Sequence, residues 1–413
     1  MPDSRTDLLS SLGSDPVSAL ARLDASQLSV GEMLSEALRS VKSHLRMEVA
    51  FISQFRDGQR VFRYIEGQIR ALPLKPGDSG PLEDSYCQRV VDGRLPSLIR
   101  DATELREALS LPITRELPVG AHLSVPIRFS DGTLYGTFCC FSSEPDDTLR
   151  DYDVSTLHLF AQFAGRLLER HAASEKVFEE RLTRISQVLE ERSYHTLYQP
   201  IMHLLDQRVV GYEALARFHP EPYRSPDKWF DEAGQVGLRS QLEIALLEEA
   251  LRGLDLVDDN VYLSLNACPS AILDGSLVHL LSNHPLERLM LEVTEHSSIE
   301  DYAVIASTLE PLRRRGLRLA VDDAGAGYAS FRHILKLRPD VIKLDRSLIT
   351  NVDTDTHSRA LAAALIRFAE ETGCKIIAEG VETENELAVL RQLNVIKAQG
   401  YLLGHPQRLT GQR

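Results

Sequence analysis

The stretch YQPIMHLLDQRVVGYEAL at residues 198–215 holds two apolar, strand-like segments with only LDQR (205–208) between them. Parallel strands need a crossover connection of a dozen or more residues, so these two strands are predicted to be antiparallel. Reversal of the first strand brings its start, Tyr198 and Gln199, to the same end as the C-terminal ends of the strands that follow. The segment therefore decides both the direction of the first strand and the end of the fold at which these two residues lie.

Six further apolar segments in the second half of the chain are also predicted to be strands. They are VYLSLNA (261–267), LMLEVTE (289–295), LRLAVDD (317–323), VIKLD (341–345), KIIAEG (375–380) and AQGYLL (398–403). Helical segments such as SQLEIALLEEALRGL (240–254) and SRALAAALIRFAEETG (358–373) lie between them. Eight strands with intervening helices predict an α/β fold over residues 195–413, a TIM-like (β/α)₈ barrel that is atypical in its antiparallel first strand.

Polar side chains gather at the C-terminal ends of these strands, which is the end of a (β/α)₈ barrel that carries active sites. The polar candidates there are Glu213, Arg217, Asn266, Glu292, Glu295, Asp322, Asp323, Lys343, Asp345, Glu379, Glu382 and Gln399, and the apolar Leu215 shares a strand face with Glu213 and Arg217. So many carboxylates at one point would repel one another, and oxygen ligands without His or Cys favour Mg²⁺, Mn²⁺ or Ca²⁺ over zinc. The adjacent acids Asp322 and Asp323 could bridge two ions ~3.5–4 Å apart, as in in-line phosphoryl displacement.

Acidic residues at strand ends also serve as N-caps of the helices that follow. For Asp345, Glu382 and Glu295 taken singly, a capping or surface role explains the residue as well as a catalytic role does. Coincidence is a poor explanation for the larger set of Glu213, Asn266, Glu292, Asp322, Asp323, Lys343 and Glu379.

The first half of the chain predicts a small α+β domain over residues 16–170. A helical pattern covers residues 30–45, and two strand pairs follow, VAFISQF with QRVFRYI and HLSVPIRF with TLYGTFCCF. The dipeptides Asp57-Gly58 and Asp131-Gly132 join the pairs, and Asp-Gly between alternating apolar residues is a strong hairpin signal because both positions favour positive φ. Helical spacing across residues 152–191 predicts one long or two successive amphipathic helices, with residues 171–194 as the linker.

The composition limits the kinds of partner. Sixty Asp and Glu against 46 Lys and Arg give a net charge of −14, which argues against a nucleic acid polymer or an anionic membrane as partner. No apolar run approaches the ~18 residues of a membrane span, and the N-terminus lacks a secretory pattern. The five cysteines are sparse and lack zinc-ligand spacing, so we expect reduced thiols in a cytoplasmic protein.

The motifs YQPI, GYEALARFHP, LSLNA, LEVTE, DDAGAGYAS, PDVIKLDRSLI, IIAEGVET and QGYLLGHP occur in this order between residues 195 and 407. Together they resemble the signature of the EAL-domain cyclic di-GMP phosphodiesterases. The resemblance implies hydrolysis of cyclic di-GMP to linear pGpG with two divalent ions, Mg²⁺ or Mn²⁺, per active site. It also implies that Ca²⁺ inhibits.

The resemblance also assigns roles to the candidate residues. The first ion would be held by Glu213, Asn266, Glu292 and Asp322, and the second by Asp322, Asp323 and Glu379. Lys343 would orient or activate the attacking water, which gives a catalytic set of Lys343, Glu379 and Glu213. Substrate contacts would come from Gln199, Leu215, Arg217, Asp323, Glu382 and Gln399, with Arg217 on a phosphate. Glu295 would support the loop after the fifth barrel strand.

That loop departs from the family pattern DDFGTGYSS, because residues 322–330 read DDAGAGYAS. Both carboxylates are kept, but the aromatic residue and hydroxyl groups of the pattern are lost. In the family this loop couples dimer contacts to the metal site, so the change leaves the rate and the regulation open. The alternative function is therefore a catalytically silent barrel that binds cyclic di-GMP or a protein partner and signals by its shape.

The first half resembles a GAF domain in SYCQRVVDG (85–93), SVPIRF (124–129) and YGTFCCFS (135–142). This resemblance implies a six-stranded sheet, a sensory or dimerisation role that regulates the barrel, a homodimer, and a small ligand of unknown identity. The cyclic-nucleotide signature NKFDE is absent, and Cys87 is followed by Gln88, which argues against bilin attachment. His44 and His122 could in principle bind haem, but a lone histidine is far more often an ordinary structural or surface residue.

Overall fold

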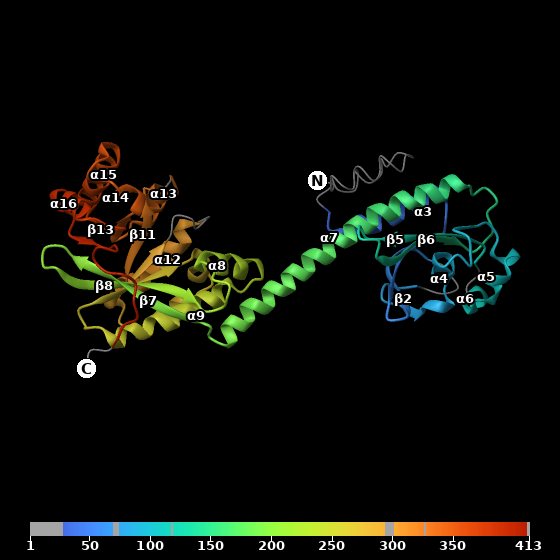
Figure 1. Ribbon diagram of the computed structural model, residues 1–413, viewed down its shortest axis with the longest axis horizontal. Helices are drawn as coiled ribbons and strands as arrows, with labels where there is room; N and C mark the ends of the chain where they lie inside the picture. Colours follow the sequence, from blue (N-terminus) through green and yellow to red (C-terminus); the bar gives the residue numbers. More distant parts are fainter. Residues whose placement is uncertain (1–27, 69–73, 117–118, 294–300, 326–327, 411–413) are drawn as a thin grey trace. The chain divides into compact units, whose positions relative to one another are not determined.

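The computed structural model describes residues 28–68, 74–116, 119–293, 301–325 and 328–410. The chain divides into two compact units, Met1–Val177 and Phe178–Arg413. One helix of 40 residues, α7 (Asp151–Glu190), carries the chain from the first unit into the second (Figure 1). Of the two arrangements expected for this segment, the structure therefore has the single long helix.

The first unit is built on one antiparallel six-stranded sheet with the strand order β3-β2-β1-β6-β5-β4. The strands are β1 (Val49–Arg56), β2 (Gln59–Gly67), β3 (Ser79–Pro81), β4 (Leu98–Ile99), β5 (Ala121–Arg128) and β6 (Leu134–Ser142). The prediction of an α+β domain around a six-stranded sheet is confirmed.

The two Asp-Gly dipeptides form different turns. Asp57 (φ 49°) and Gly58 (φ 72°) make the predicted two-residue turn between β1 and β2. Between β5 and β6 the loop is longer, because the backbone N–H of Phe129 donates to the carbonyl of Thr133 at 2.9 Å. Gly132 takes positive φ there, while the Asp131 carboxylate accepts a hydrogen bond from the Thr133 N–H at 2.8 Å. The second dipeptide therefore belongs to a longer hairpin loop with glycine in the left-handed region.

Helices cover both faces of this sheet (Figure 1). The predicted helix α3 (Val30–Leu45) begins in a capping box formed by Ser29 and Glu32, and it packs with the first part of α7 on one face. The other face is covered by η1 (Leu82–Asp84), α4 (Tyr86–Val91), η2 (Ala102–Glu104), α5 (Arg106–Ser110) and α6 (Pro112–Glu116). Each face has its own apolar core, so the sheet is buried on both sides.

The second unit is a closed eight-stranded barrel with the strand order β10-β11-β12-β13-β14-β7-β8-β9. Its strands are β7 (Tyr194–His203), β8 (Arg208–Phe218), β9 (Tyr262–Ala267), β10 (Leu289–Val293), β11 (Arg318–Ala324), β12 (Val341–Leu344), β13 (Lys375–Ala378) and β14 (Lys397–Ala398). Strand β7 is antiparallel to both of its neighbours, β8 and β14, whereas the remaining pairs are parallel. The predicted barrel with a reversed first strand is confirmed.

The last barrel strand is shorter than the sequence pattern indicates. It covers Lys397–Ala398 rather than residues 398–403. Beyond it the backbone curls around Val381, whose N–H donates to the carbonyl of Gln399 and whose carbonyl accepts from Leu402. A Cβ atom on Gly400 would lie 2.1 Å from the Val381 carbonyl oxygen, so the tight turn requires glycine at this position.

Helices surround the barrel, and a cluster of apolar side chains, here called the plug, fills its interior. The plug lies below the mouth of the barrel, which is the end formed by the C-terminal ends of the parallel strands. The helices are α8 (Pro226–Gln235), α9 (Arg239–Leu251), η3 (Arg252–Leu256), α10 (Pro269–Leu273), α11 (Ser276–Leu281), η4 (Leu286–Arg288), α12 (Tyr302–Arg314), α13 (Tyr328–Leu337), α14 (Arg346–Ile349), α15 (Thr356–Thr372) and α16 (Glu384–Gln392). Ile201, Tyr262, Met290 and Ile377 form the plug with other inward-facing residues. The Tyr262 ring lies where a side chain on Gly211 would stand, since a Cβ there would be 2.5 Å from Tyr262 Cζ.

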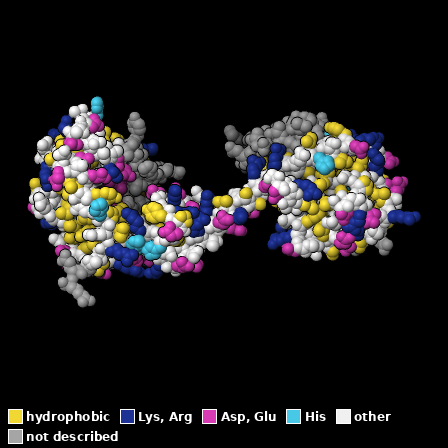
Figure 2. All heavy atoms as spheres, in the orientation of Figure 1, with side chains coloured by type: hydrophobic (Ala, Val, Ile, Leu, Met, Phe, Trp, Pro, Cys, Tyr) yellow, Lys and Arg dark blue, Asp and Glu magenta, His cyan; other side chains and the backbone are white. Residues whose placement is uncertain are grey.

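The surface carries charges of both signs. On the face drawn in Figure 2, Lys and Arg side chains are interspersed with Asp and Glu side chains over both units. Within the described residues, no helix has the length and apolar character needed to cross a membrane.

Candidate active site at the mouth of the barrel

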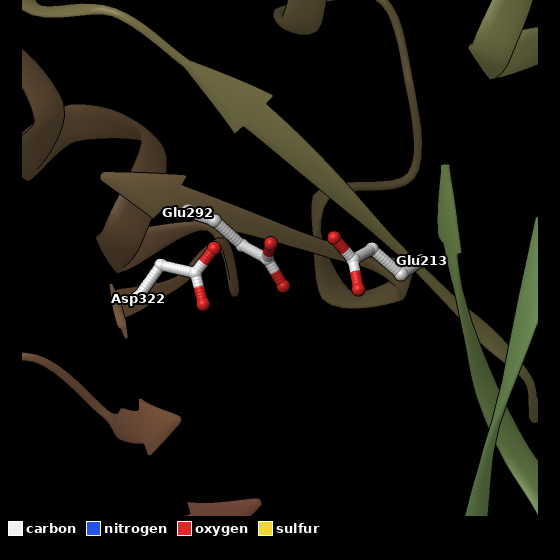
Figure 3. A group of neighbouring side chains, drawn as sticks. All are labelled: Glu213, Glu292 and Asp322. Atoms are coloured by element: carbon white, nitrogen blue, oxygen red, sulfur yellow. The ribbon is translucent and has the colours of Figure 1, made fainter. Parts of the chain in front are cut away.

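Carboxylates from three strands meet inside the mouth of the barrel. Glu213 on β8, Glu292 on β10 and Asp322 on β11 place oxygen atoms within 4.8 Å of one another. Figure 3 shows the three side chains pointing into one space. Asn266 on β9 pairs with Glu292 in the parallel register, and its side-chain amide donates to Glu213 Oε1 at 3.4 Å. The structure therefore brings together the four residues expected at the first ion.

Lys343 on β12 lies among these carboxylates with a fully buried side chain. Its Nζ atom is 2.8 Å from Glu292, 2.6 Å from Glu379, 3.1 Å from Asp322 and 3.5 Å from Glu213. One ammonium thus faces four carboxylates. A buried ion pair is stable only where opposite charges and hydrogen bonds balance, and here negative charge exceeds positive.

The combined effect of burial and this excess of negative charge shifts the pKa values of Lys343, Glu292 and Glu379 upward. Burial by itself lowers the pKa of Lys343, but the surrounding carboxylates raise it well above its ordinary value. Burial raises the pKa of Glu292 to about 8 against the attraction of Lys343, and the charge of Glu213 adds to the rise. Burial and the charge of Asp322 likewise raise the pKa of Glu379 well above its ordinary value. Additional cations at this point would favour the ionised carboxylates.

A second acidic group overlaps the first and has the donor atoms that a hard cation prefers. Asp322, Asp323 and Glu379 place oxygens within 4.8 Å of one another, so Asp322 belongs to both groups. Among the described residues, Asp322 Oδ1 and Glu379 Oε1 are buried without a hydrogen bond of good geometry, although both lie near the Lys343 ammonium. Carboxylate and amide oxygens without sulfur or imidazole suit Mg²⁺ or Mn²⁺. The donor set therefore fits two neighbouring divalent cations.

The backbone at Asp323 explains how two consecutive acids reach one site. Successive side chains of a strand normally point to opposite faces. Asp323 has φ 52°, in the left-handed region, and the pairing of β11 with β12 shifts register between Val321 and Ala324. This break in the alternation lets Asp323 approach the same ligand space as Asp322. Such backbone conformations cost about 1–3 kcal/mol and cluster at functional sites.

A cavity of about 720 Å³ adjoins the carboxylates. Four predicted site residues, Leu215, Arg217, Asn266 and Asp323, line part of it. The volume lies within the range typical of small-molecule sites. The guanidinium of Arg217 donates from Nη1 to the carbonyl of Ala216 at 2.8 Å, which fixes the cation at the cavity wall.

Two glutamines make hydrogen bonds on the side of the site next to the antiparallel strand β7. Gln199 on β7 pairs with Glu213 in the antiparallel register, and its amide donates to the Gly404 carbonyl at 3.2 Å. The Gln399 amide donates directly to Glu213 Oε2. Both glutamines are buried, so the orientation of Glu213 is set by neighbours from both ends of the barrel sequence.

Other predicted residues lie apart from the cluster around Lys343. Glu382 forms an ion pair with Arg346 at 2.7 Å on the rim. Asp345 is the N-cap of α14 and accepts from the Ser347 N–H at 2.9 Å, so the capping interpretation describes its contacts in the structure. Glu295 lies outside the described residues.

Some residues of the site were not identified from the sequence. The fully buried Ser264 donates its hydroxyl to Glu292 Oε1. A signal for it existed, because Ser264 and Asn266 are two positions apart and therefore share one face of β9. Asp227, Asp231 and Arg239 line the cavity from α8 and α9, and no strand periodicity could place them there.

Comparison with protein-family models divides the chain as the structure does. The EAL domain model matches residues 182–406, which is more than half of the chain. The GAF domain model matches residues 27–169.

The curated relatives are longer than this chain. The cyclic di-GMP phosphodiesterase NbdA of Pseudomonas aeruginosa is 35% identical over 263 residues, which are 60% of this chain and 33% of that protein. The probable cyclic di-GMP phosphodiesterase PdeD of Escherichia coli is 29% identical over 54% of this chain and 43% of its own length. The chain thus matches less than half of either relative.

Some solved structures with the same fold match about half of this chain, and others match most of it. PaMucR phosphodiesterase in a cyclic di-GMP complex is 30% identical with a TM-score of 0.50, covering 55% of this chain and 97% of its own. The EAL enzyme Bd1971 in its cAMP-bound form covers 88% of this chain and 92% of its own with a TM-score of 0.53, and at 18% identity it indicates fold alone.

Proposed function

The chain belongs to the EAL domain family and carries a GAF domain ahead of its EAL barrel, and from this premise we propose that it hydrolyses one phosphodiester bond of cyclic di-GMP to give linear pGpG. The observation that carries the proposal is the single buried ammonium of Lys343 among the carboxylates of Glu213, Glu292, Asp322 and Glu379. Desolvating a charge costs several kcal/mol, so an arrangement with excess negative charge is explained best by bound cations.

Mg²⁺ or Mn²⁺ is the proposed cofactor, with two ions per site. Glu213, Asn266, Glu292 and Asp322 would hold the first ion, and Asp322, Asp323 and Glu379 the second. When bound, the ions supply neutralising charge for the phosphoryl oxygens and a lower pKa for the attacking water. Ca²⁺ takes more ligands at longer distances than Mg²⁺, and we therefore expect it to inhibit.

The residues of the chain position the reactants. Lys343 is held at a fixed point by ion pairs with its carboxylate neighbours and by the hydrogen bond that it donates to Glu292, which suits it to orient the attacking water. Glu213 is fixed by Asn266 and Gln399 before substrate arrives. Groups that are already fixed lower the activation barrier, because no further orientational entropy is lost when the transition state forms.

The cavity beside the cluster is the proposed substrate site. Arg217 would bind a phosphate and Leu215 would contact the nucleotide, because both line the cavity. Gln199, Asp323 and Gln399 would contact the part of the substrate nearest the ions, and Glu382 would contribute from the rim.

A nucleotide assay tests the function. The purified chain is incubated with cyclic di-GMP and Mn²⁺ or Mg²⁺, and the products are separated by chromatography. We expect pGpG from the unmodified chain and a rate lower by about 100-fold or more for Glu213→Ala, since even groups that only support metal ligands are worth 10–100-fold. The matched control is Asp206→Ala, an exposed acid in the turn just before β8, which should keep the full rate.

The opposite result would favour the catalytically silent barrel. Its supporting observation is the altered loop Ala324-Gly325-Ala326, in which alanines stand at two positions where the family's pattern has Phe and Thr. If the chain binds cyclic di-GMP but forms no pGpG at any enzyme excess, the hydrolase proposal is wrong. Equal rates for Glu213→Ala and the unmodified chain would contradict the metal assignment.

Regulation by the GAF domain, a homodimer and a cytoplasmic location complete the proposal, with residues 16–170 as the GAF domain, 171–194 as the linker and 195–413 as the barrel. A second copy of the chain would cover the exposed apolar side chains of Val177, Phe178 and Leu182 on α7. Light scattering should give twice the 46.2 kDa of one chain. Phe178→Glu should reduce the mass to that of one chain, whereas Glu179→Gln on the same helix should not.

A further inference from the structure

A small cavity lies in the first unit, on the sheet face covered by α4, α5 and α6. Its volume is about 30 Å³, and Phe62, Tyr86, Arg60, Cys87 and His122 are among the residues that line it. One water needs about 10–15 Å³ measured in this way, so the cavity has room for about two oxygen-sized atoms. Among the described residues, Arg60 Nε and His122 Nδ1 are buried there without a hydrogen-bond partner. The cavity therefore offers polar groups to a very small polar molecule.

The thiol of Cys87 lines this cavity and lies next to a second thiol. Cys87 is in α4, Cys139 is in β6, and their Sγ atoms are 3.7 Å apart. Both side chains are at most 1% exposed, and all five cysteines are free thiols. A disulfide has an S–S length of about 2.05 Å, so the two sulfurs would have to approach by about 1.7 Å.

The two thiols differ in character because their surroundings differ. A hydrogen bond from Cys139 lowers the pKa of Cys87 to about 6 against the effect of burial, and the Arg60 charge contributes in the same direction. Burial and the neighbouring Cys87 raise the pKa of Cys139 well above its ordinary value. Thr137 Oγ1 and Ser124 Oγ both lie 3.1 Å from Cys139 Sγ and hold it in place. Since the thiolate is the nucleophile, Cys87 is the sulfur expected to react first.

We propose that Cys87 and Cys139 form a peroxide-oxidised dithiol–disulfide pair, with hydrogen peroxide entering the cavity beside Arg60 and His122. Hydrogen peroxide has two oxygen atoms and matches the space in the cavity. One of its oxygens can accept a hydrogen bond from Arg60 Nε, and one of its O–H groups can donate to the neutral ring of His122, whose pKa burial lowers to about 3.

The chemistry balances with peroxide as the oxidant. The Cys87 thiolate attacks one peroxide oxygen, an S–O bond forms, the O–O bond breaks, and the departing hydroxide takes up the proton that Cys87 had released. The product is a sulfenic acid and one water. Cys139 then attacks the Cys87 sulfur, the S–S bond forms, and the S–O bond breaks. The second hydroxide leaves with the Cys139 proton, so two thiols are oxidised and one peroxide becomes two waters.

The test uses the full-length chain, reduced and then treated with graded hydrogen peroxide. Free thiols are counted after denaturation, and cross-linked peptides are identified by mass spectrometry without reducing agent. We expect the count to fall from five to three per chain, with one cross-linked pair that contains Cys87 and Cys139. A dithiol reductant should restore all five.

Three substitutions separate the roles of the cysteines. Cys139→Ser should stop the reaction at a sulfenic acid on Cys87, which dimedone captures. Cys87→Ser should abolish the loss of the two thiols. The matched control is Cys140→Ser, because Cys140 is the next residue of β6, is equally buried and points to the other face of the sheet. It should leave the cross-link between Cys87 and Cys139 unchanged.

Two results would overturn the proposal. One is a count that stays at five until the more accessible Cys268 and Cys374 are oxidised. The other is a loss of two thiols that persists in Cys87→Ser. The thiol count and the cross-linked peptide of the unmodified chain decide the first result without any variant, so the proposal can be overturned even if Cys87→Ser fails to fold.

Discussion

At the scale of single residues, the ammonium of Lys343 partly neutralises the negative charge of the carboxylates at the barrel mouth. Lys343→Met would leave four carboxylates, three of them on buried residues, without the cation that lies within 3.5 Å of each of them. Removing one partner of a buried ion pair costs about 3–5 kcal/mol, and we expect a loss of that size in the free energy of unfolding without added metal. Urea unfolding of the barrel measures it.

The control for this prediction is Lys336→Met, which removes an exposed lysine from α13. Exposed ion pairs contribute about 0–1 kcal/mol, so this variant should unfold close to the unmodified chain. If both variants unfold at the same urea concentration, Lys343 does not stabilise the cluster.

A second residue gives a pH dependence to the first unit. Burial lowers the pKa of His122 to about 3, below the value of about 6.5 in the unfolded chain. Between pH 6.5 and 3 the unfolded state therefore binds the proton and the folded state does not, so stability falls as the pH falls through this window. At pH 5 the loss from His122 is about 2 kcal/mol relative to pH 8.

Urea unfolding of the first unit at pH 8 and pH 5 measures this loss. In His122→Gln the difference between the two pH values should shrink by about 2 kcal/mol. His44→Gln is the control, because His44 is only partly buried in the last turn of α3. An unchanged difference in His122→Gln would show that other groups dominate the acid sensitivity.

The residue scale also shows where sequence reasoning reaches its limit. Glu213, Glu292, Asp322 and Lys343 could be predicted as neighbours because each lies at a strand end of one barrel. Asp345 could not be separated from them in advance, since a strand-end acid and a helix N-cap have the same sequence pattern. The positive φ of Asp323 and the hydroxyl of Ser264 behind Glu292 depend on three-dimensional packing.

At the scale of elements, two glycines of the first unit should respond in opposite ways to the same substitution. Gly58 has φ 72° in the β1–β2 turn, where an L side chain is strained, so Gly58→Ala should lower stability by about 1 kcal/mol. Gly31 lies in α3, and a Cβ there would make an ordinary contact 3.8 Å from Tyr64. Gly31→Ala should therefore raise stability by up to about 1 kcal/mol.

Thermal or urea unfolding of the two variants measures the difference in sign. A loss of stability in Gly31→Ala would mean that the start of α3 does not accept a side chain. No loss in Gly58→Ala would mean that the turn can adopt another form without cost.

Elements with strong local signals could be predicted, and those set by distant contacts could not. The helix at residues 30–45 and the turn at Asp57-Gly58 match the structure because capping and turn chemistry are local. The second Asp-Gly belongs to a longer loop, since the hydrogen bond from the Phe129 N–H to the Thr133 carbonyl closes the hairpin outside this dipeptide. The last barrel strand ends at Ala398 because Val381, far away in the sequence, takes the hydrogen bonds of the following turn.

At the scale of the whole molecule, the two units have separate cores and should unfold in separate transitions. Mn²⁺ with a non-hydrolysable cyclic di-GMP analogue should stabilise the barrel alone. At a ligand concentration of 100 times Kd the gain is about 2.7 kcal/mol. Calorimetry should show one transition that moves to higher temperature and one that does not.

The calorimetric control is Glu213→Ala, in which the ligand-dependent shift should be lost while both transitions remain. A single transition that moves as a whole would show that the two units unfold together. The two-part organisation itself could be predicted from the change between hairpin and alternating strand–helix patterns, whereas the sequence does not specify how the units influence each other.

The reversed direction of β7 has a consequence for how information could enter the barrel. In an all-parallel barrel the first strand starts at the end opposite the C-terminal strand ends, and therefore far from the active site. Here α7 ends at Glu190 and β7 begins at Tyr194, so Gln199, opposite Glu213, follows nine residues after the end of the helix. A twist at the end of α7 would reach Gln199 along the backbone of β7 and, from there, Glu213 through the pairing of β7 with β8.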